Sequence, residues 1–210
     1  MSFLDQARYQ RYAPKSKINH LFITGFGRSG TTFLVSLMRR CGLNTGFPLN
    51  QELAVSATKG GGEWHVPQGN RPWPEDPKVE MPFVFKAPRV FQDKEWEKFY
   101  PIYSPMHVIV CYRDPETYAL TVKGTMDPLV GTDPDPSYVA RKWMDCFIDM
   151  ERNVEHFTLM EYPRMVTDME YCYSRLLSTG MSMPFQENFT TCFKEVAKPD
   201  MVTYPGGVKS

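Results

Sequence analysis

The chain has 210 residues, of which 24 are lysine or arginine and 24 are aspartate or glutamate, so its formal net charge is zero. This balance excludes a general electrostatic attraction to nucleic acid or to an anionic membrane, so any anion-binding site must be local. The length suits one domain with a sizeable core, and an aromatic content of 14% argues against disorder. We therefore predict a single domain over residues 1–210, with no nucleic-acid or membrane partner.

The cysteines and the N-terminal segment favour a cytoplasmic protein. The five cysteines are odd in number, widely spaced and mostly within apolar patterns, which is typical of reduced core thiols and not of a disulfide framework or a zinc site. The first 20 residues contain no apolar core of signal-peptide length, and no stretch approaches the ~20 apolar residues of a membrane helix. We expect no bound metal.

The first predicted strand, His20–Thr24, runs directly into the sequence GFGRSGTT at Gly25–Thr32. Strand, glycine-rich turn and helix follow the phosphate-binding pattern G-x-x-x-x-G-K-[ST], except that Thr31 stands at the lysine position. Glycines let backbone N–H groups approach a ligand, and the start of the next helix adds unpaired N–H groups and a positive dipole end. We predict an anion cradle to which Thr31 and Thr32 add hydroxyl donors; the alternative is a turn that only joins strand to helix.

The missing lysine changes the chemistry that the turn favours. Kinases and ATPases need that lysine for the outer phosphates, together with Mg²⁺. Here the nearby fixed cation is Arg28, whose guanidinium binds oxyanions through a planar fork and never deprotonates. This favours a transferring group that carries less charge than a γ-phosphate and needs no metal, such as the sulfuryl group of a 5′-phosphosulfate.

Two long segments, residues 59–82 and 124–136, are rich in turn-forming residues. Unstructured connections of this length are uncommon in compact domains unless they carry function or are disordered. Because both follow elements of the predicted anion site, we predict that they wall an acceptor pocket. The alternative is that both are surface loops.

The second predicted strand, Phe83–Lys86, ends in Lys86 and is followed by Ala87-Pro88. Parallel strands bind ligands at the edge where their carboxyl ends meet, so Lys86 is predicted to face the same edge as the glycine-rich turn. The alternative for Lys86 is a surface lysine beside a turn. A short helix over Asp93–Tyr100 is predicted next.

The third predicted strand, His107–Tyr112, is a short apolar run typical of a buried parallel strand. It is followed by Arg113, by Asp114 as a suitable helix N-cap, and by Pro115 as a suitable first residue of a helix over Pro115–Lys123. Arg113 is thereby placed at the ligand-binding edge of the sheet. The alternative for Arg113 is a pairing with a surface carboxylate.

The remaining elements complete an α/β pattern. A helix that opens at Asp135-Pro136 has an apolar face that includes Trp143, which we expect to pack in the core. A strand at Phe157–Glu161 and helices at Thr167–Leu177 and Gln186–Val196 follow. Strands that alternate with helices predict an α/β fold, here a three-layer sandwich with a central parallel sheet, like that of the P-loop nucleoside-triphosphate hydrolases.

These motifs resemble those of the PAPS-dependent sulfotransferases. The run GFGRSGTTFL at 25–34 is similar to the 5′-phosphosulfate loop of that family, [KR]-[SG]-G-T-[TR]. The Arg113-Asp114-Pro115 segment is similar to the family's R-[DN]-P after a strand, and Thr121 stands eight residues on, where the family has serine. Lys86-Ala87-Pro88 is similar to the family's K-x-P. The chain therefore looks like a small soluble member of bacterial or viral type.

The resemblance implies that PAPS is the donor and that a set of loop and strand-end residues binds it. That set comprises Gly27, Arg28, Ser29, Gly30, Thr31, Thr32, Phe33, Arg113 and Thr121. The implied reaction moves a sulfuryl group, without a metal, to a hydroxyl or amine of a small-molecule or glycan acceptor.

Sulfuryl transfer needs fixed charge and a base. Arg28 and Lys86 are candidates to stabilise charge that develops on the sulfuryl and bridging oxygens. The acceptor must also lose a proton. Glu63 is one candidate base, His65 is a second because imidazole titrates near neutral pH, and Glu52 is a third.

Two other functions stay open. A P-loop kinase with a diverged loop would need the lysine that Thr31 replaces, and an Mg²⁺-binding aspartate at a strand end, for which Asp114 comes closest. A nucleotide-binding protein without catalysis would keep the loop as structure.

Overall fold

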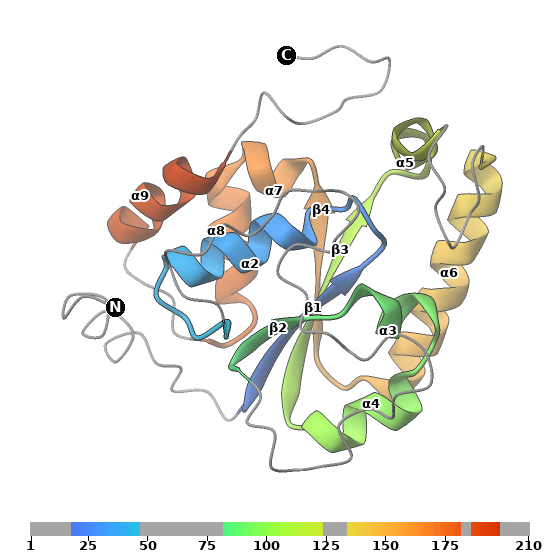
Figure 1. Ribbon diagram of the computed structural model, residues 1–210, viewed down its shortest axis with the longest axis horizontal. Helices are drawn as coiled ribbons and strands as arrows, with labels where there is room; N and C mark the ends of the chain where they lie inside the picture. Colours follow the sequence, from blue (N-terminus) through green and yellow to red (C-terminus); the bar gives the residue numbers. More distant parts are fainter. Residues whose placement is uncertain (1–17, 47–81, 124–133, 182–185, 198–210) are drawn as a thin grey trace.

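The computed structural model describes residues 18–46, 82–123, 134–181 and 186–197 (Figure 1). In these residues four parallel strands form one sheet in the order β2-β1-β3-β4. The strands are β1 (His20–Gly25), β2 (Val84–Lys86), β3 (Met106–Arg113) and β4 (Phe157–Tyr162). The predicted α/β class and parallel sheet are confirmed, and each predicted strand is correct to within one residue at either end.

Helices cover both faces of the sheet (Figure 1). One layer contains α2 (Thr31–Arg40), α7 (Arg164–Thr167), α8 (Met169–Leu177) and α9 (Gln186–Val196). The other contains α3 (Pro88–Gln92), α4 (Trp96–Tyr103), α5 (Pro115–Val122) and α6 (Pro136–Asn153). None of the helices in the described ranges combines the length and apolarity that a bilayer crossing needs.

Alternation along the strands feeds both apolar layers. On β1, Leu21 and Ile23 join the cluster under α2, α8 and α9, whereas Phe22 joins the cluster under α3, α4 and α6. Successive side chains of a strand point to opposite faces, so one apolar strand supplies two cores. A parallel sheet covered on both faces accounts for the continuous apolar runs in β1 and β3.

Local signals set several helix ends. α2 ends two residues before Gly42, whose left-handed backbone (φ 87°) directs its N–H to the carbonyl of Arg39. Asp114 and Asp135 cap α5 and α6 by accepting hydrogen bonds from backbone N–H groups of the first turn, and a proline follows each. The predicted starts of α5 and α6 are therefore confirmed.

The predicted helix over Asp93–Tyr100 was wrong in its start. The chain instead forms α3 from Pro88 onward, and α4 begins only at Trp96. Lys94 separates the two with a left-handed backbone (φ 57°) that no helix continues through.

The predicted helix over Thr167–Leu177 is present as α8, which begins two residues later than predicted and ends at Leu177, and a separate short helix, α7, precedes it. Asp168 has an extended backbone (φ −118°, ψ 96°) that ends α7. Its carboxylate then accepts a hydrogen bond of 2.9 Å from the N–H of Tyr171 and caps α8.

All five cysteines lie within the described residues, and each is buried without forming a disulfide. Burial raises the pKa of Cys111 and Cys172, and it raises the pKa of Cys146 to about 11. These three groups are therefore protonated thiols at neutral pH, as expected for core cysteines.

His107 lies on β3 near the amino end of the sheet, and only 7% of its surface is exposed. Its Nε2 lies 2.8 Å from Oγ1 of Thr158 on β4. Burial, reinforced by the like charge of His156, lowers the pKa of His107 from 6.5 to about 4. The imidazole is therefore neutral in the folded protein at physiological pH.

We expect acid to destabilise the protein through His107. The unfolded chain binds a proton near pH 6.5 and the folded chain only near pH 4, so the free energy of unfolding falls as the pH decreases between these values. A difference of about 2.5 between the two pKa values corresponds to a loss of about 3 kcal/mol in the free energy of unfolding. Urea unfolding across this range should show the loss in the wild type and a smaller one in His107→Gln.

The comparison variant is His156→Gln, which removes an exposed imidazole whose charge is the smaller of the two causes of the lowered pKa of His107, so most of the pH dependence should remain. Burial also lowers the pKa of His20, which contributes in the same direction and leaves part of the pH dependence in either variant. Identical pH profiles for the wild type and His107→Gln would contradict the assignment.

Candidate functional site

Three segments meet at the carboxyl edge of the sheet. They are the loop 26–30 after β1, Lys86 at the end of β2 and Arg113 at the end of β3. Because β1 lies between β2 and β3 and all three strands are parallel, Lys86 and Arg113 flank the loop. α2 begins directly after the loop, at Thr31. The site is therefore assembled around the start of α2.

The loop begins where Gly25 meets β3. A Cβ on Gly25 would lie 2.1 Å from the carbonyl oxygen of Cys111, so only glycine fits there. Phe26 is buried, with its ring centroid 4.3 Å from that of Trp143, which confirms that Trp143 packs in the core. The carbonyl of Phe26 accepts a hydrogen bond of 2.5 Å from Oγ of the buried Ser29. These contacts close the loop into a tight turn.

Arg28 is the exposed residue of the loop, next to the half-buried Gly27. Its backbone is left-handed (φ 61°), which a residue with a side chain adopts at a cost of roughly 1 kcal/mol. Strain of this kind often occurs where a loop is shaped for a ligand. The conformation leaves the guanidinium exposed while the carbonyl of Arg28 accepts a hydrogen bond from Arg113.

Gly30 is the N-cap residue of α2 and has a left-handed backbone (φ 85°). A Cβ on Gly30 would lie 2.1 Å from Cε of Met165 and 2.7 Å from Cδ2 of Tyr162. The start of α2 thus rests directly on these two side chains. α2 has no side-chain N-cap hydrogen bond, and the first N–H groups of a helix have no partner within the helix. This end of α2 carries the positive end of the helix dipole.

Lys86 reaches the first turn of α2 from the neighbouring strand. Its side chain is 2% exposed, and its Nζ donates a hydrogen bond of 3.1 Å to Oγ1 of Thr32. The hydroxyl of Thr24 donates to the carbonyl of Ala87 at 3.1 Å and ties the end of β1 to the residue after Lys86. The prediction that Lys86 faces the same sheet edge as the loop is confirmed.

Arg113 approaches the loop from the other neighbouring strand. It is 3% exposed, and its Nη1 donates to the carbonyl of Arg28 at 3.4 Å. Its guanidinium lies 4.9 Å from the ring centroid of Tyr162. Burial lowers the pKa of Arg113, while Tyr162 and Asp114 act in the opposite direction. A guanidinium stays charged at neutral pH under such a shift.

Three predicted binding residues have side chains engaged within the fold. The hydroxyl of Thr121 donates to the carbonyl of Thr117, one turn earlier in α5, at 2.8 Å. The ring of Phe33 packs against Phe193 of α9, with centroids 5.8 Å apart, and Thr31 is buried. The ring of Phe33 therefore packs within the helical layer, so Phe33 can offer an anion its backbone N–H but not its side chain.

The three predicted bases, Glu52, Glu63 and His65, lie outside the described residues. So does almost all of the two predicted acceptor-site loops, of which the structure describes only residue 82 and residues 134–136.

Tyr162, which we did not predict from the sequence, is part of the site. It ends β4, is in register with Arg113 and contacts Gly30. Tyr162 ends the strand next to β3, and that position in the sequence could have indicated its place at the site.

The arrangement suits an anion with more than one charged group. Three cationic residues come from three segments at this edge: Lys86 contacts the first turn of α2, Arg113 contacts the loop backbone, and Arg28 is an exposed residue of the loop itself. Within the described ranges, no group of three or more His, Cys, Asp or Glu side chains is placed to hold a metal ion.

Comparison with known protein families found no family model that matches the chain, and comparison with curated proteins found no matching sequence.

Gly30→Ala is expected to destabilise the protein more than Gly180→Ala. Both glycines have a left-handed backbone (φ 85° and 76°), which costs an alanine about 1–2 kcal/mol. Only the Cβ at position 30 meets neighbours, and overpacking adds about 1–3 kcal/mol. Urea unfolding of the two variants separates the backbone cost from the clash.

Gly180 is a matched control because a Cβ added there would have nothing within 4 Å of it. Equal losses of stability in the two variants would show that Tyr162 and Met165 do not support the start of α2.

Proposed function

We propose that the chain is a PAPS-dependent sulfotransferase of P-loop type, which transfers a sulfuryl group to a hydroxyl or amine of a small-molecule or glycan acceptor. The observation that carries the proposal is the placement of two buried cations around the start of α2. Nζ of Lys86 lies 3.1 Å from Oγ1 of Thr32, and Nη1 of Arg113 donates to the carbonyl of Arg28 at 3.4 Å. Two cations on the two strands that flank one loop suit a ligand with anionic groups at both ends of a nucleoside.

Each end of the donor has its own group of residues in this proposal. The start of α2, with the backbone of the loop and the hydroxyl of Thr32, binds the 5′-phosphate. Arg113 binds the 3′-phosphate, because a guanidinium fork matches phosphate oxygens. Thr121 lies on α5, eight residues after Arg113, and supports the same phosphate by rotating its hydroxyl away from Thr117.

Lys86 and Arg28 carry the catalytic role in the proposal. They stabilise charge on the sulfuryl oxygens and on the oxygen that leaves with the 5′-phosphate. The acceptor atom forms the new bond to sulfur, the bond from sulfur to the 5′-phosphate oxygen breaks, and the acceptor proton passes to a base. Glu63, His65 and Glu52 stay the proposed bases, and segments 59–82 and 124–136 the proposed acceptor walls. The proposed reaction takes place without a metal and in the cytoplasm.

A diverged P-loop kinase is the second candidate, and Lys86 is the observation that favours it. Its Nζ places a cation at the first turn of α2, although Thr31 occupies the lysine position of the motif. A kinase also needs an aspartate that binds Mg²⁺, and Asp114 is the nearest candidate. Its carboxylate instead accepts a hydrogen bond from the N–H of Thr117 as the cap of α5, which argues against a kinase. A nucleotide-binding protein without catalysis would use the same residues and differ only in turnover.

Arg113→Ala is expected to weaken binding of adenosine 3′,5′-bisphosphate (PAP) by about 10- to 100-fold, since a charge-assisted hydrogen bond contributes roughly 1.5–3 kcal/mol. Adenosine 5′-phosphosulfate lacks the 3′-phosphate, so its affinity should change less than about threefold. Isothermal titration with chelator present measures both ligands on both proteins.

The matched control is Arg152→Ala, which removes an exposed arginine from the last turn of α6 and should leave both affinities unchanged. Equal losses of affinity for the two ligands in Arg113→Ala would contradict the assignment of Arg113 to the 3′-phosphate. Tighter binding of ATP with Mg²⁺ than of PAP by the wild type would favour the kinase.

Lys86→Met is expected to slow sulfuryl transfer by about 100- to 1,000-fold, the usual effect of removing one stabilising group from a transition state. PAP has no sulfuryl group, so its affinity should change by less than about threefold. The assay follows release of PAP from PAPS on a panel of phenols, alcohols and aminosugars.

Lys194→Met serves as the control, because Lys194 is exposed on α9. An undiminished transfer rate in Lys86→Met would remove Lys86 from the catalytic group. Tight PAP binding by the wild type, with no transfer to any acceptor or to water, would favour the non-catalytic protein.

A further inference from the structure

Tyr162 contacts both Arg113 and the start of α2. It is the last residue of β4, and its register partner on β3 is Arg113. Residues in register on neighbouring strands point to the same face of a sheet, which brings the two side chains together. The guanidinium carbon of Arg113 lies 4.9 Å from the centroid of the Tyr162 ring, within the range of a cation–π contact.

The same ring also touches the start of α2. A Cβ on Gly30 would lie 2.7 Å from Cδ2 and 3.4 Å from Cε2 of Tyr162. These distances mean that the edge of the ring packs against the backbone of the N-cap residue, with no side chain between them. One rigid side chain therefore contacts both the helix start and the arginine.

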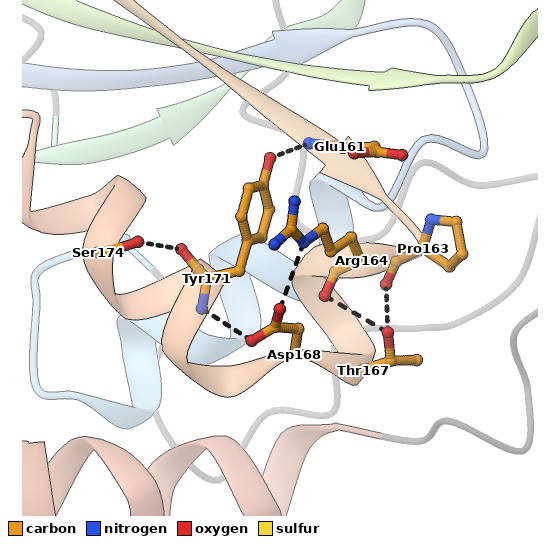
Figure 2. A network of polar contacts seen from close by, with 7 residues as sticks. All are labelled: Glu161, Pro163, Arg164, Thr167, Asp168, Tyr171 and Ser174. Carbon is orange, nitrogen blue, oxygen red and sulfur yellow. Dashed lines mark hydrogen bonds and ion pairs between the residues drawn. The ribbon is translucent and has the colours of Figure 1, made fainter.

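A network of polar contacts joins the end of β4 to α7 and α8 around Tyr162 in the chain (Figure 2). The hydroxyl of Tyr171 accepts a hydrogen bond of 2.9 Å from the N–H of Glu161, the residue before Tyr162. Arg164 lies over the ring of Tyr171 at 4.3 Å and donates to the carboxylate of Asp168 at 3.3 Å. Met165, on the short helix α7 held by this network, packs beside Tyr162 against Gly30. The ring thus lies beside Met165 of α7 at Gly30, and the strand end that carries it is joined to α8 through Glu161 and Tyr171.

We propose that Tyr162 is a positioning residue that sets the distance between the anion cradle at the start of α2 and the guanidinium of Arg113. This inference rests on the proposed function, in which these two places bind the 5′ and 3′ phosphate groups of one nucleotide. The Tyr162 ring is incompressible and spans from Gly30 to Arg113, so it fixes the spacing that the two phosphates must match.

The loop, Arg113 and Tyr162 each contact the other two, which explains why one side chain can set the spacing between the helix start and the arginine. Arg113 donates to the carbonyl of Arg28, two residues before Gly30, so loop, arginine and ring contact one another in turn. The hydrogen bond from Arg113 to the loop, 3.4 Å, is at the long end of the range, and the packed ring of Tyr162 adds a contact of fixed shape between the arginine and the helix start. A smaller side chain at position 162 lets Arg113 move independently of α2.

The test compares PAP with adenosine 5′-monophosphate (AMP), which lacks the 3′-phosphate. In Tyr162→Leu we expect PAP affinity to fall by about tenfold or more, with AMP affinity changed less than about threefold, so the preference for PAP collapses. Tyr162→Phe keeps the ring and should retain the preference. If the ring acts through Arg113, Tyr162→Leu added to Arg113→Ala should cause no further loss of PAP affinity.

Thermal unfolding is measured for every variant, and the PAP-to-AMP ratio is read only from folded protein. Should Tyr162→Leu fail to fold, Tyr162→Met and the Phe variant supply the comparison. A retained ratio, or an equal loss for both nucleotides, overturns the inference while leaving the proposed function intact. A wild-type protein that binds AMP as tightly as PAP overturns the donor assignment itself, and the inference with it.

Discussion

At the end of β1 the backbone passes so close to β3 that a Cβ at position 25 would lie 2.1 Å from the Cys111 carbonyl oxygen. This contact keeps Gly25 paired with Cys111 to the last residue of the strand and then turns the chain out of the sheet. Phe26 enters the aromatic cluster under α3 and α6, whereas Gly30 rests on Tyr162 in the opposite layer. The loop thus crosses the sheet edge from one helical layer to the other, and both layers hold it.

Lys86 and Arg113 are almost removed from water, with 2% and 3% of their surfaces exposed. Burial disfavours the charged form of a side chain, and it lowers the pKa of Arg113. A threonine hydroxyl contacts the lysine, while a backbone carbonyl and an aromatic face contact the arginine. In the proposed function, an anion bound between them would add charge–charge attraction where little water screens it. That attraction would offset the desolvation that is costly for the two cations.

Lys86 illustrates how a motif and a structure can differ. The phosphate-binding pattern expects a lysine at position 31, and the chain has threonine there. In the fold, Lys86 of β2 reaches Thr32 instead, 54 residues away along the chain. The cation comes from a neighbouring strand and contacts the helix start from the side. A cation beside the helix start is therefore compatible with sulfuryl and with phosphoryl transfer, which is why the proposed function rests on both Lys86 and Arg113.

The sequence alone determined the elements whose signals are local. Apolar runs indicated the four strands, and Asp-Pro pairs indicated the starts of α5 and α6, because caps and strand burial depend on residues a few positions apart. It also indicated that the loop, Lys86 and Arg113 share one edge, since parallel strands end together. Only the tertiary structure decided two contacts at the site: Lys86 contacts Thr32, and the ring of Tyr162 lies between Gly30 and Arg113. It also decided a third feature, the interruption at Lys94 of the helix predicted over Asp93–Tyr100. The first two contacts depend on strand order and register, which join residues far apart in the chain, and the third depends on a backbone conformation that lysine rarely adopts.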